Sequence, residues 1–199
     1  MGDEYEEELR RSFWTTLREG GELYAGGGRL EKSYRRFAER LNALGVSYAL
    51  VGGYALIVHG VRRFTEDIDL RVTAEGLHQV REDLIGRGYV AIPGNDRDIR
   101  DAETGVRVEF VVTGQYPGDG KEKPVAFPDP SGSSTEMGGV RVVTLPILVE
   151  LKLASGMTGK GRLQDLADVQ RLIQTHGLGR DFAEHLAPHV RDQYLRLLD

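Results

Sequence analysis

The sequence predicts an α+β fold, in which a small mixed β-sheet flanked by helices is followed by a C-terminal helical subdomain. Two observations predict it. Up to Val143, short apolar or alternating segments typical of strands are interspersed with segments of helical periodicity. From Pro146 onward the apolar spacing is helical throughout, and the chain contains no internal repeat.

We expect three parts along the chain: an N-terminal helix and glycine-rich linker (1–27), a core (28–144) and a helical subdomain (145–199). Apolar residues at helical spacing predict the first helix over 3–18. The glycines that follow it are interpreted as a hinge, because the sequence beyond them lacks Walker spacing and no strand precedes them.

The elements of the core and of the helical subdomain follow from periodicity and turn residues. The amphipathic helix over 31–44 ends at Gly45, a typical residue after a helix C-cap. Residues 114–138, rich in Gly, Pro, Ser and Asp, are expected to form a long loop with one short strand near 125–127. Strands are expected at 48–51, 67–72, 98–101, 106–112 and 140–143, and further helices at 54–59, 74–87, 146–155, 162–175, 179–186 and 188–198.

Composition excludes several classes of function. The 199 residues include no cysteine, which excludes disulfides, zinc–thiolate sites, iron–sulfur clusters and thiol nucleophiles. The net charge of −5 disfavours a domain dedicated to duplex DNA, although a local basic groove remains compatible with it. The N-terminus lacks the features of a secretory signal and no apolar run is long enough to span a bilayer, so we expect a cytoplasmic protein without a membrane partner.

The strongest chemical signal is the pair Asp67 and Asp69 within a predicted strand. Residues two apart on a strand face the same side, so both carboxylates stand together while Ile68 faces the core. Two adjacent carboxylates repel each other, and Asp is disfavoured in strands. A divalent cation offsets this cost, and oxygen ligands suit Mg²⁺ or Mn²⁺.

Gly52 and Gly53, between a predicted strand and a predicted helix, form the second part of the motif. Glycine lets the backbone approach a ligand closely, and a helix N-terminus offers N–H groups to a phosphate. Arg62 and Arg63 lie between this turn and the aspartates, where they could add positive charge near a triphosphate. These residues predict a nucleotide-phosphate site.

Glu109 is the third candidate acidic residue. In the alternating segment 106–112, Arg107 and Glu109 share one face and the apolar residues share the other. If this strand neighbours the strand of Asp67, Glu109 completes a carboxylate cluster of the kind that supports metal-assisted phosphoryl transfer.

The combination of Gly-Gly, Arg63-x-Thr65-x-Asp67-x-Asp69 and a later acidic residue resembles the DNA polymerase β-type nucleotidyltransferase superfamily, in particular its AbiEii-type toxin branch. Lys152 and the Asp-x-x-Asp helix of Asp165 and Asp168 resemble the second half of that branch. The resemblance covers roughly residues 31–175.

The resemblance implies an enzyme that uses an NTP as substrate and Mg²⁺ (or Mn²⁺) as cofactor. It places the nucleotide on Gly52, Gly53, Arg63, Thr65 and Lys152, and the metal on Asp67, Asp69 and Glu109. Lys152, Asp165 and Asp168 join these three carboxylates as catalytic candidates. The sequence departs from the family pattern at two positions. The third acidic residue is Glu109, where Asp is commoner, and the second glycine is Gly53, where many members have Ser.

Structural interpretations of the same residues stay open at this point. Lys152 could be a solvated helix residue, and Asp165 and Asp168 could be surface charges paired with neighbouring arginines. His59, before Gly60, is interpreted as a capping or packing residue. His185 and His189 are not expected to bind a metal, because Pro188 interrupts a simple helical face between them.

Three functions remain open. The first is transfer of a nucleoside monophosphate from an NTP to an acceptor hydroxyl with pyrophosphate release; in the toxin-like branch the acceptor would be a tRNA 3′ end and a cognate antitoxin a partner. The second keeps the reaction but uses a protein side chain or a small molecule such as an aminoglycoside. The third is a non-catalytic nucleotide-binding or partner-binding module. A basic face on the helical half favours RNA, and an acidic pocket favours a cationic antibiotic.

Overall fold

The computed structural model describes residues 28–198, so the helix expected at 3–18 lies outside the described residues. The helices are α3 (Arg29–Ala43), α4 (Gly52–Val58), α5 (Ala74–Leu84), α6 (Leu145–Thr158), α7 (Leu163–His176) and α8 (Pro188–Arg196), with 3₁₀ turns η1 (Pro130–Gly132) and η2 (Arg180–His185). The strands are β1 (Tyr48–Leu50), β2 (Asp67–Val72), β3 (Tyr89–Ile92), β4 (Asn95–Asp101), β5 (Arg107–Val112), β6 (Ser134–Met137) and β7 (Val140–Val143).

The strands form one mixed sheet in the order β3-β4-β5-β2-β1-β7-β6. The two central strands β2 and β5 run parallel to each other, and β1 pairs antiparallel with β2 and parallel with β7. The hairpins β3–β4 and β6–β7 form the two edges. The expected α+β fold with a small mixed sheet is confirmed.

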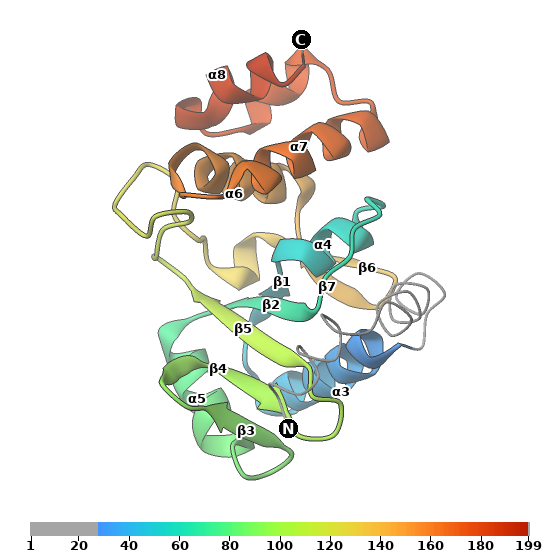
Figure 1. Cartoon of the computed structure of the whole chain (residues 1–199), viewed down its shortest axis with the longest axis vertical. Coiled ribbons are helices and arrows are strands. Elements are labelled where there is room, and N and C mark those ends of the chain that lie inside the picture. Colours follow the sequence, from blue (N-terminus) through green and yellow to red (C-terminus); the bar gives the residue numbers. More distant parts are fainter. Residues whose placement is uncertain (1–27, 199) are drawn as a thin grey trace.

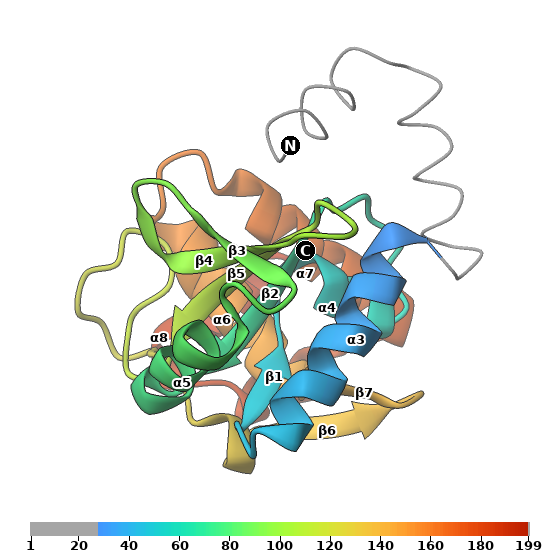
Figure 2. The same cartoon turned by 90° about the horizontal axis from the view of Figure 1, so that it is seen from below.

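The two faces of the sheet have different coverings. Alternation on β2 and β5 sends Ile68, Leu70 and Phe110 to a buried face, as predicted. Helices α3 and α5 cover this face, and the Phe37 ring of α3 lies 6.0 Å from the Phe110 ring, centroid to centroid (Figure 2). The opposite face of β2 carries polar side chains and faces α4 and the C-terminal helices.

The C-terminal helices form a layer at one end of the sheet. Helices α6, α7 and α8 stack on one another, with the α4 turn between them and the central strands (Figure 1). Helix α6 is apolar on nearly all sides, because it packs against both the core and α7. Within residues 28–198, no helix is both long and apolar enough to cross a membrane.

Several element boundaries differ from the sequence-based expectation. The strand expected near 125–127 is wrong: Phe127 exchanges backbone hydrogen bonds with Gly114 and Gln115, but this contact is too short to be a strand. The helix expected over 74–87 ends at Leu84, and residues 180–185 form a 3₁₀ turn where an α-helix was expected. The edge strands β3 and β6 were not predicted; β6 is polar and mostly exposed, which leaves little periodic signal.

Candidate active site

The three candidate carboxylates lie on the polar face of the two central strands. In the parallel register of β2 and β5, Asp69 is the direct partner of Glu109, and Asp67 is the partner of Arg107. Because alternate residues of a strand share a face, Asp67, Asp69 and Glu109 all face the same side. The prediction for Glu109 required its strand to neighbour the strand of Asp67, and the two strands are indeed neighbours.

The electrostatics of this cluster disfavour three charged carboxylates without a counter-cation. Burial, followed by the neighbouring Asp67, raises the pKa of Asp69 to about 6. Burial, followed by Asp69 and Asp67, raises the pKa of Glu109 to about 7. In both cases additional positive charge near the carboxylate would lower its pKa.

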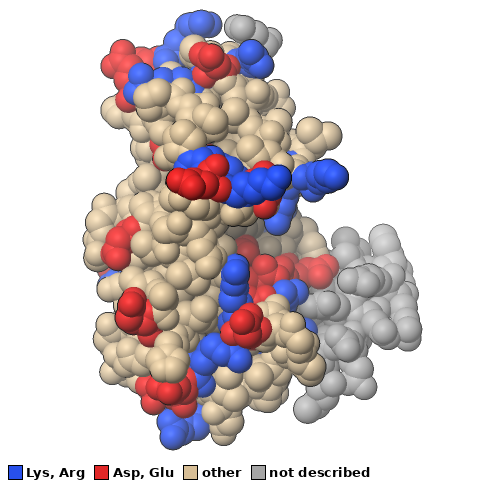
Figure 3. Space-filling model, turned by 90° about the vertical axis from the view of Figure 1, so that its left-hand side faces the viewer, with Lys and Arg blue, Asp and Glu red and all other residues tan. Residues whose placement is uncertain are grey.

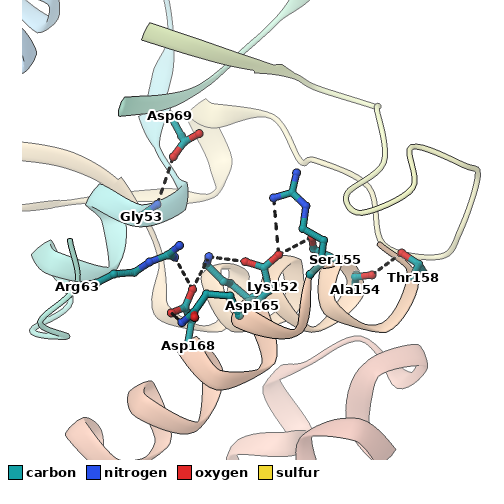
Figure 4. Close-up of polar contacts among 11 residues, drawn as sticks. Gly53, Arg63, Asp69, Lys152, Ala154, Ser155, Thr158, Asp165 and Asp168 are labelled. Atoms are coloured by element: carbon teal, nitrogen blue, oxygen red, sulfur yellow. Dashed lines mark hydrogen bonds and ion pairs between the residues drawn. The ribbon is translucent and has the colours of Figure 1, made fainter. Parts of the chain in front are cut away.

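The glycine turn is built around Asp69. Gly52 has φ +63°, and a Cβ placed on it would lie 1.9 Å from Oδ2 of Asp69, so only glycine fits there. The Gly53 N–H donates to the same Oδ2 at 3.2 Å (Figure 4). A Cβ on Gly53 would lie 2.6 Å from Oγ1 of Thr65, so Thr65 closes the other side of the turn.

A cleft of about 180 Å³ lies between the carboxylates and the helical half. Asp69, Glu109 and Gly52 line it from the core, while Lys152, Asp165 and Arg162 line it from α6, α7 and the turn between them. In the space-filling view a hollow with acidic side chains lies below an edge of the helical half that is rich in Lys and Arg (Figure 3). The helical half thus forms one wall of the cleft.

Lys152 lies at the centre of a buried ionic network. Its Nζ donates to Oδ1 of Asp165 at 2.7 Å and to Oδ2 of Asp168 at 2.8 Å. Arg63 donates to the same oxygen of Asp168 at 2.5 Å, and the Ser155 hydroxyl donates to Asp165 at 2.7 Å (Figure 4). Two cations balance two carboxylates, which is the condition under which charged groups tolerate burial.

This network decides between the two interpretations of the helical residues. Lys152, Asp165 and Asp168 are 7%, 7% and 0% exposed. The alternatives of a solvated lysine and of surface aspartates are therefore wrong, although Oδ2 of Asp165 does lie 4.0 Å from Nη1 of Arg162. Asp168 is partnered from outside α7, by Arg63 of the loop before β2 and by Lys152 of α6. Arg62, in contrast, is exposed.

The histidines take structural positions. His59 is buried, and its Nε2 lies 2.8 Å from the carbonyl oxygen of Val143, while its own carbonyl lies 2.8 Å from Nε2 of His176. The packing interpretation of His59 fits these contacts. His185 ends η2 and His189 belongs to α8, and the part of the chain that the structure describes offers no metal-binding cluster there.

The carboxylates fit a divalent cation by their chemistry. All three offer hard oxygen donors, and burial together with the neighbouring carboxylates raises the pKa of Asp69 and of Glu109. Within residues 28–198, however, no three such side chains are already gathered closely enough to hold an ion. The side chains of Asp67, Asp69 and Glu109 would therefore have to move closer together to bind one ion.

Sequence reasoning missed several groups around the cleft. Ser155 lines it and is the hydroxyl partner of Asp165; it stands three residues after Lys152 on α6, and that helical spacing was the available signal. Pro117, Gly118 and Phe127 of the long loop line it as well. Arg107, between Asp98 and Glu109, is a further charged group beside the carboxylates.

Known proteins of similar fold were found among solved structures. The solution structure of the antibiotic-resistance factor ANT(2″)-Ia matches with a TM-score of 0.53 at 15% identity, over 82% of this chain and 92% of that one. The crystal structure of ANT(2″)-Ia in complex with adenylyl-2″-tobramycin matches with a TM-score of 0.51 at 13% identity, over 80% and 92%. At these identities the likeness shows a shared fold. No curated protein sequence matches the chain.

A family model described as nucleotidyl transferase AbiEii toxin, type IV toxin–antitoxin system, matches residues 36–197. The match begins in α3 and ends just after α8, so it includes the glycine turn, the carboxylates of β2 and β5, and the lysine–aspartate network. The chain therefore belongs to the AbiEii nucleotidyltransferase family.

Proposed function

We propose that this protein transfers a nucleoside monophosphate from an NTP to an acceptor hydroxyl and releases pyrophosphate, with Mg²⁺ or Mn²⁺ as cofactor. The observation that carries the proposal is the pairing of Asp69 with Glu109 across β2 and β5, with Asp67 on the same face. Family membership supports the reaction class.

Each group of the cleft has a part in this reaction. Asp67, Asp69 and Glu109 hold the cation, which would neutralise phosphate charge and stabilise the attacking and leaving oxygens. Gly52, which has no side chain, leaves room for the Asp69 carboxylate, and the phosphates would approach the backbone of this turn. The acceptor oxygen bonds to the α-phosphorus, the bond from that phosphorus to the bridging oxygen breaks, and pyrophosphate leaves with that oxygen.

Glu109 is our candidate for the acceptor of the hydroxyl proton. It lies directly beside Asp69 and lines the cleft, which places its carboxylate within the site where the acceptor hydroxyl would react. Lys152 lines the opposite wall. An ammonium has three donors, and Asp165 and Asp168 take two, so we assign the third to the triphosphate.

For the acceptor, we propose the 3′ end of an RNA, with tRNA as the first candidate. A second hollow, of about 560 Å³, adjoins the cleft and shares Val111, Phe127 and Arg162 with it. Arg97 and Arg162 provide phosphate-binding groups there, and Tyr116 and Phe127 provide aromatic surface for a base. None of the described residues that line this hollow is acidic, which disfavours a polycationic antibiotic.

An aminoglycoside is retained as the second candidate acceptor, because the protein of similar fold was solved with an adenylylated tobramycin. A cognate antitoxin, which the family description implies, is the partner we propose.

The test is a transfer screen with each of the four labelled NTPs, Mg²⁺ and, separately, total RNA, purified tRNA, tobramycin or cell protein. We expect label on RNA, none with Asp69→Asn, and full activity for Glu136→Gln, an exposed acid on β6. Label on tobramycin or on protein alone would replace the RNA proposal. If no acceptor is labelled but calorimetry detects Mg²⁺–NTP binding, the protein is a binding module and the catalytic proposal fails.

The hollow is tested separately. Arg97→Gln should raise KM for the RNA about tenfold or more while leaving the Kd for the NTP unchanged, because Arg97 lines the hollow and not the cleft. Arg87→Gln, in the turn after α5 and with an ion pair to Asp83, is the matched charge control and should change neither constant.

A further inference from the structure

Arg107 occupies an unusual position beside the carboxylate cluster. It faces the same side of the sheet as Glu109, two residues along β5, and is the cross-strand partner of Asp67. Its Nη1 lies 3.2 Å from Oε1 of Glu109, while its Nη2 lies 2.6 Å from Oδ2 of Asp98. One guanidinium therefore joins a carboxylate of the candidate cation site to a carboxylate of the neighbouring strand.

The Asp98 end of this bridge is firmly held. Asp98 is 6% exposed, and its Oδ1 accepts from the Phe110 N–H at 3.1 Å. Its Oδ2 also accepts from the side-chain amide of Asn95 at 2.7 Å. Because Asp98 is fixed by two further donors, it anchors Nη2 of Arg107 whatever happens at Glu109.

The Glu109 end is the adjustable one. The contact from Nη1 of Arg107 to Glu109 is longer, at 3.2 Å, and both side chains are 31% exposed. The guanidinium takes this position although its own Nε is buried without a hydrogen-bond partner in the described structure. The two carboxylates thus set the orientation of the guanidinium, even though one of its own N–H donors has no partner there.

We propose that Arg107 is a built-in counter-cation of the candidate metal site, which holds Glu109 beside Asp69 until a divalent cation displaces it from Oε1. The inference rests on the proposed function, since it takes Glu109 as a cation ligand. A divalent ion and a guanidinium repel each other, so binding of the ion releases Nη1 from Glu109 while Nη2 stays on Asp98. Arg107 is a positioning residue in this scheme, and it sets the cation affinity of the site.

The direction of the effect follows from charge. Removing the guanidinium removes a positive charge that competes for Glu109, so the cation should bind more tightly although Glu109 is less constrained. The protein without cation should lose stability, because Glu109 loses its ion pair with the guanidinium. A merely structural salt bridge would lower stability without tightening cation binding.

The experiment compares the wild type, Arg107→Gln and Arg100→Gln, with Mn²⁺ alone as the probe and no NTP. Arg100 lies opposite Arg107 in the β4–β5 pairing and donates to the Gly105 carbonyl, so its replacement removes the same charge one strand away. Mn²⁺ affinity is measured by calorimetry or electron paramagnetic resonance, and thermal unfolding is followed with and without Mn²⁺.

We expect Arg107→Gln to bind Mn²⁺ about tenfold more tightly than the wild type, to melt at a lower temperature without the ion, and to regain more stability when Mn²⁺ is added. Arg100→Gln should follow the wild type. Unchanged or weaker Mn²⁺ binding in Arg107→Gln, or an equal gain in Arg100→Gln, would overturn the inference. If the wild type binds no Mn²⁺ at all, the proposed metal site fails first, and the two failures are thereby distinguished.

Discussion

Replacement of Gly52 by alanine tests how closely the glycine turn is fitted to Asp69. Gly52 has φ +63°, where an L-residue costs about 1–2 kcal/mol. The added Cβ would also lie 1.9 Å from Oδ2 of Asp69, so the carboxylate or the turn must move, which costs about 1–3 kcal/mol more. Gly45→Ala is the matched control, because Gly45 has φ +69° and no atom within 4 Å of the added Cβ.

The two variants separate strain from contact. Gly45→Ala should lose about 1–2 kcal/mol, and Gly52→Ala about 2–5 kcal/mol, measured by chemical unfolding with thermal melting as a check. Displacement of Asp69 by about an ångström should also lower label transfer about 100-fold in Gly52→Ala, and Gly45→Ala should keep its activity. If both variants lose the same stability and Gly52→Ala remains active, Asp69 is not constrained by the turn and the reasoning fails.

Three further predictions follow from the charges around the cleft. Since the pKa values of Asp69 and Glu109 are raised to about 6 and about 7, the folded protein without cation binds protons more strongly than the unfolded chain, so its stability should fall as pH rises from about 4 to 7. Unfolding in EDTA across that range checks the slope, which Asp69→Asn should reduce. Lys152→Met leaves Asp165 without its ammonium partner and should cost about 3 kcal/mol or more in urea unfolding, whereas a loss below 1 kcal/mol would contradict the buried network. Lys123→Met removes donors to the Pro117 carbonyl and to Thr158 of α6, so limited proteolysis should cut the 114–127 loop faster, with unchanged global stability as the control.

Local periodicity was sufficient to predict a helix or strand where the residues of the segment themselves determine which face is buried. The strand over Asp67–Val72 was predicted at its observed bounds, because strict alternation of charged and apolar residues is typical of a strand with one apolar face. Helix α3 was predicted to within two residues for the same kind of reason. The edge strand β6 escaped prediction because its residues are mostly exposed and polar, so neither face of it carries an apolar pattern.

The sequence could not predict which strands and side chains far apart along the chain become neighbours. Asp69 and Glu109 are forty residues apart, and only the parallel pairing of β2 with β5 makes them neighbours. The burial of Lys152 was equally hidden, since a lysine within an apolar helix is compatible with a solvated end of the side chain. Its two carboxylate partners lie on α7, and Arg63, which also donates to Asp168, comes from the loop before β2.

The distribution of charge explains why the helical half belongs to the site. The core contributes the carboxylates of Asp69 and Glu109 to one wall of the cleft, and the helical half contributes Lys152 and Arg162 to the other. Arg63 joins the two walls, since it leaves the core loop next to Thr65 and ends on Asp168 of α7. A triphosphate between the walls would meet the cation held by the core and the ammonium held by the helices.

Loss of the contact between Arg63 and Asp168 should therefore weaken NTP binding, even if Arg63 does not contact the phosphates. Without Arg63, Lys152 is the remaining cation beside Asp168, so Asp168 attracts the Lys152 ammonium more strongly and leaves it less available to the triphosphate. Binding of an NTP to Arg63→Met, compared with Arg62→Met at the exposed neighbouring position, separates this indirect role from a simple loss of positive charge.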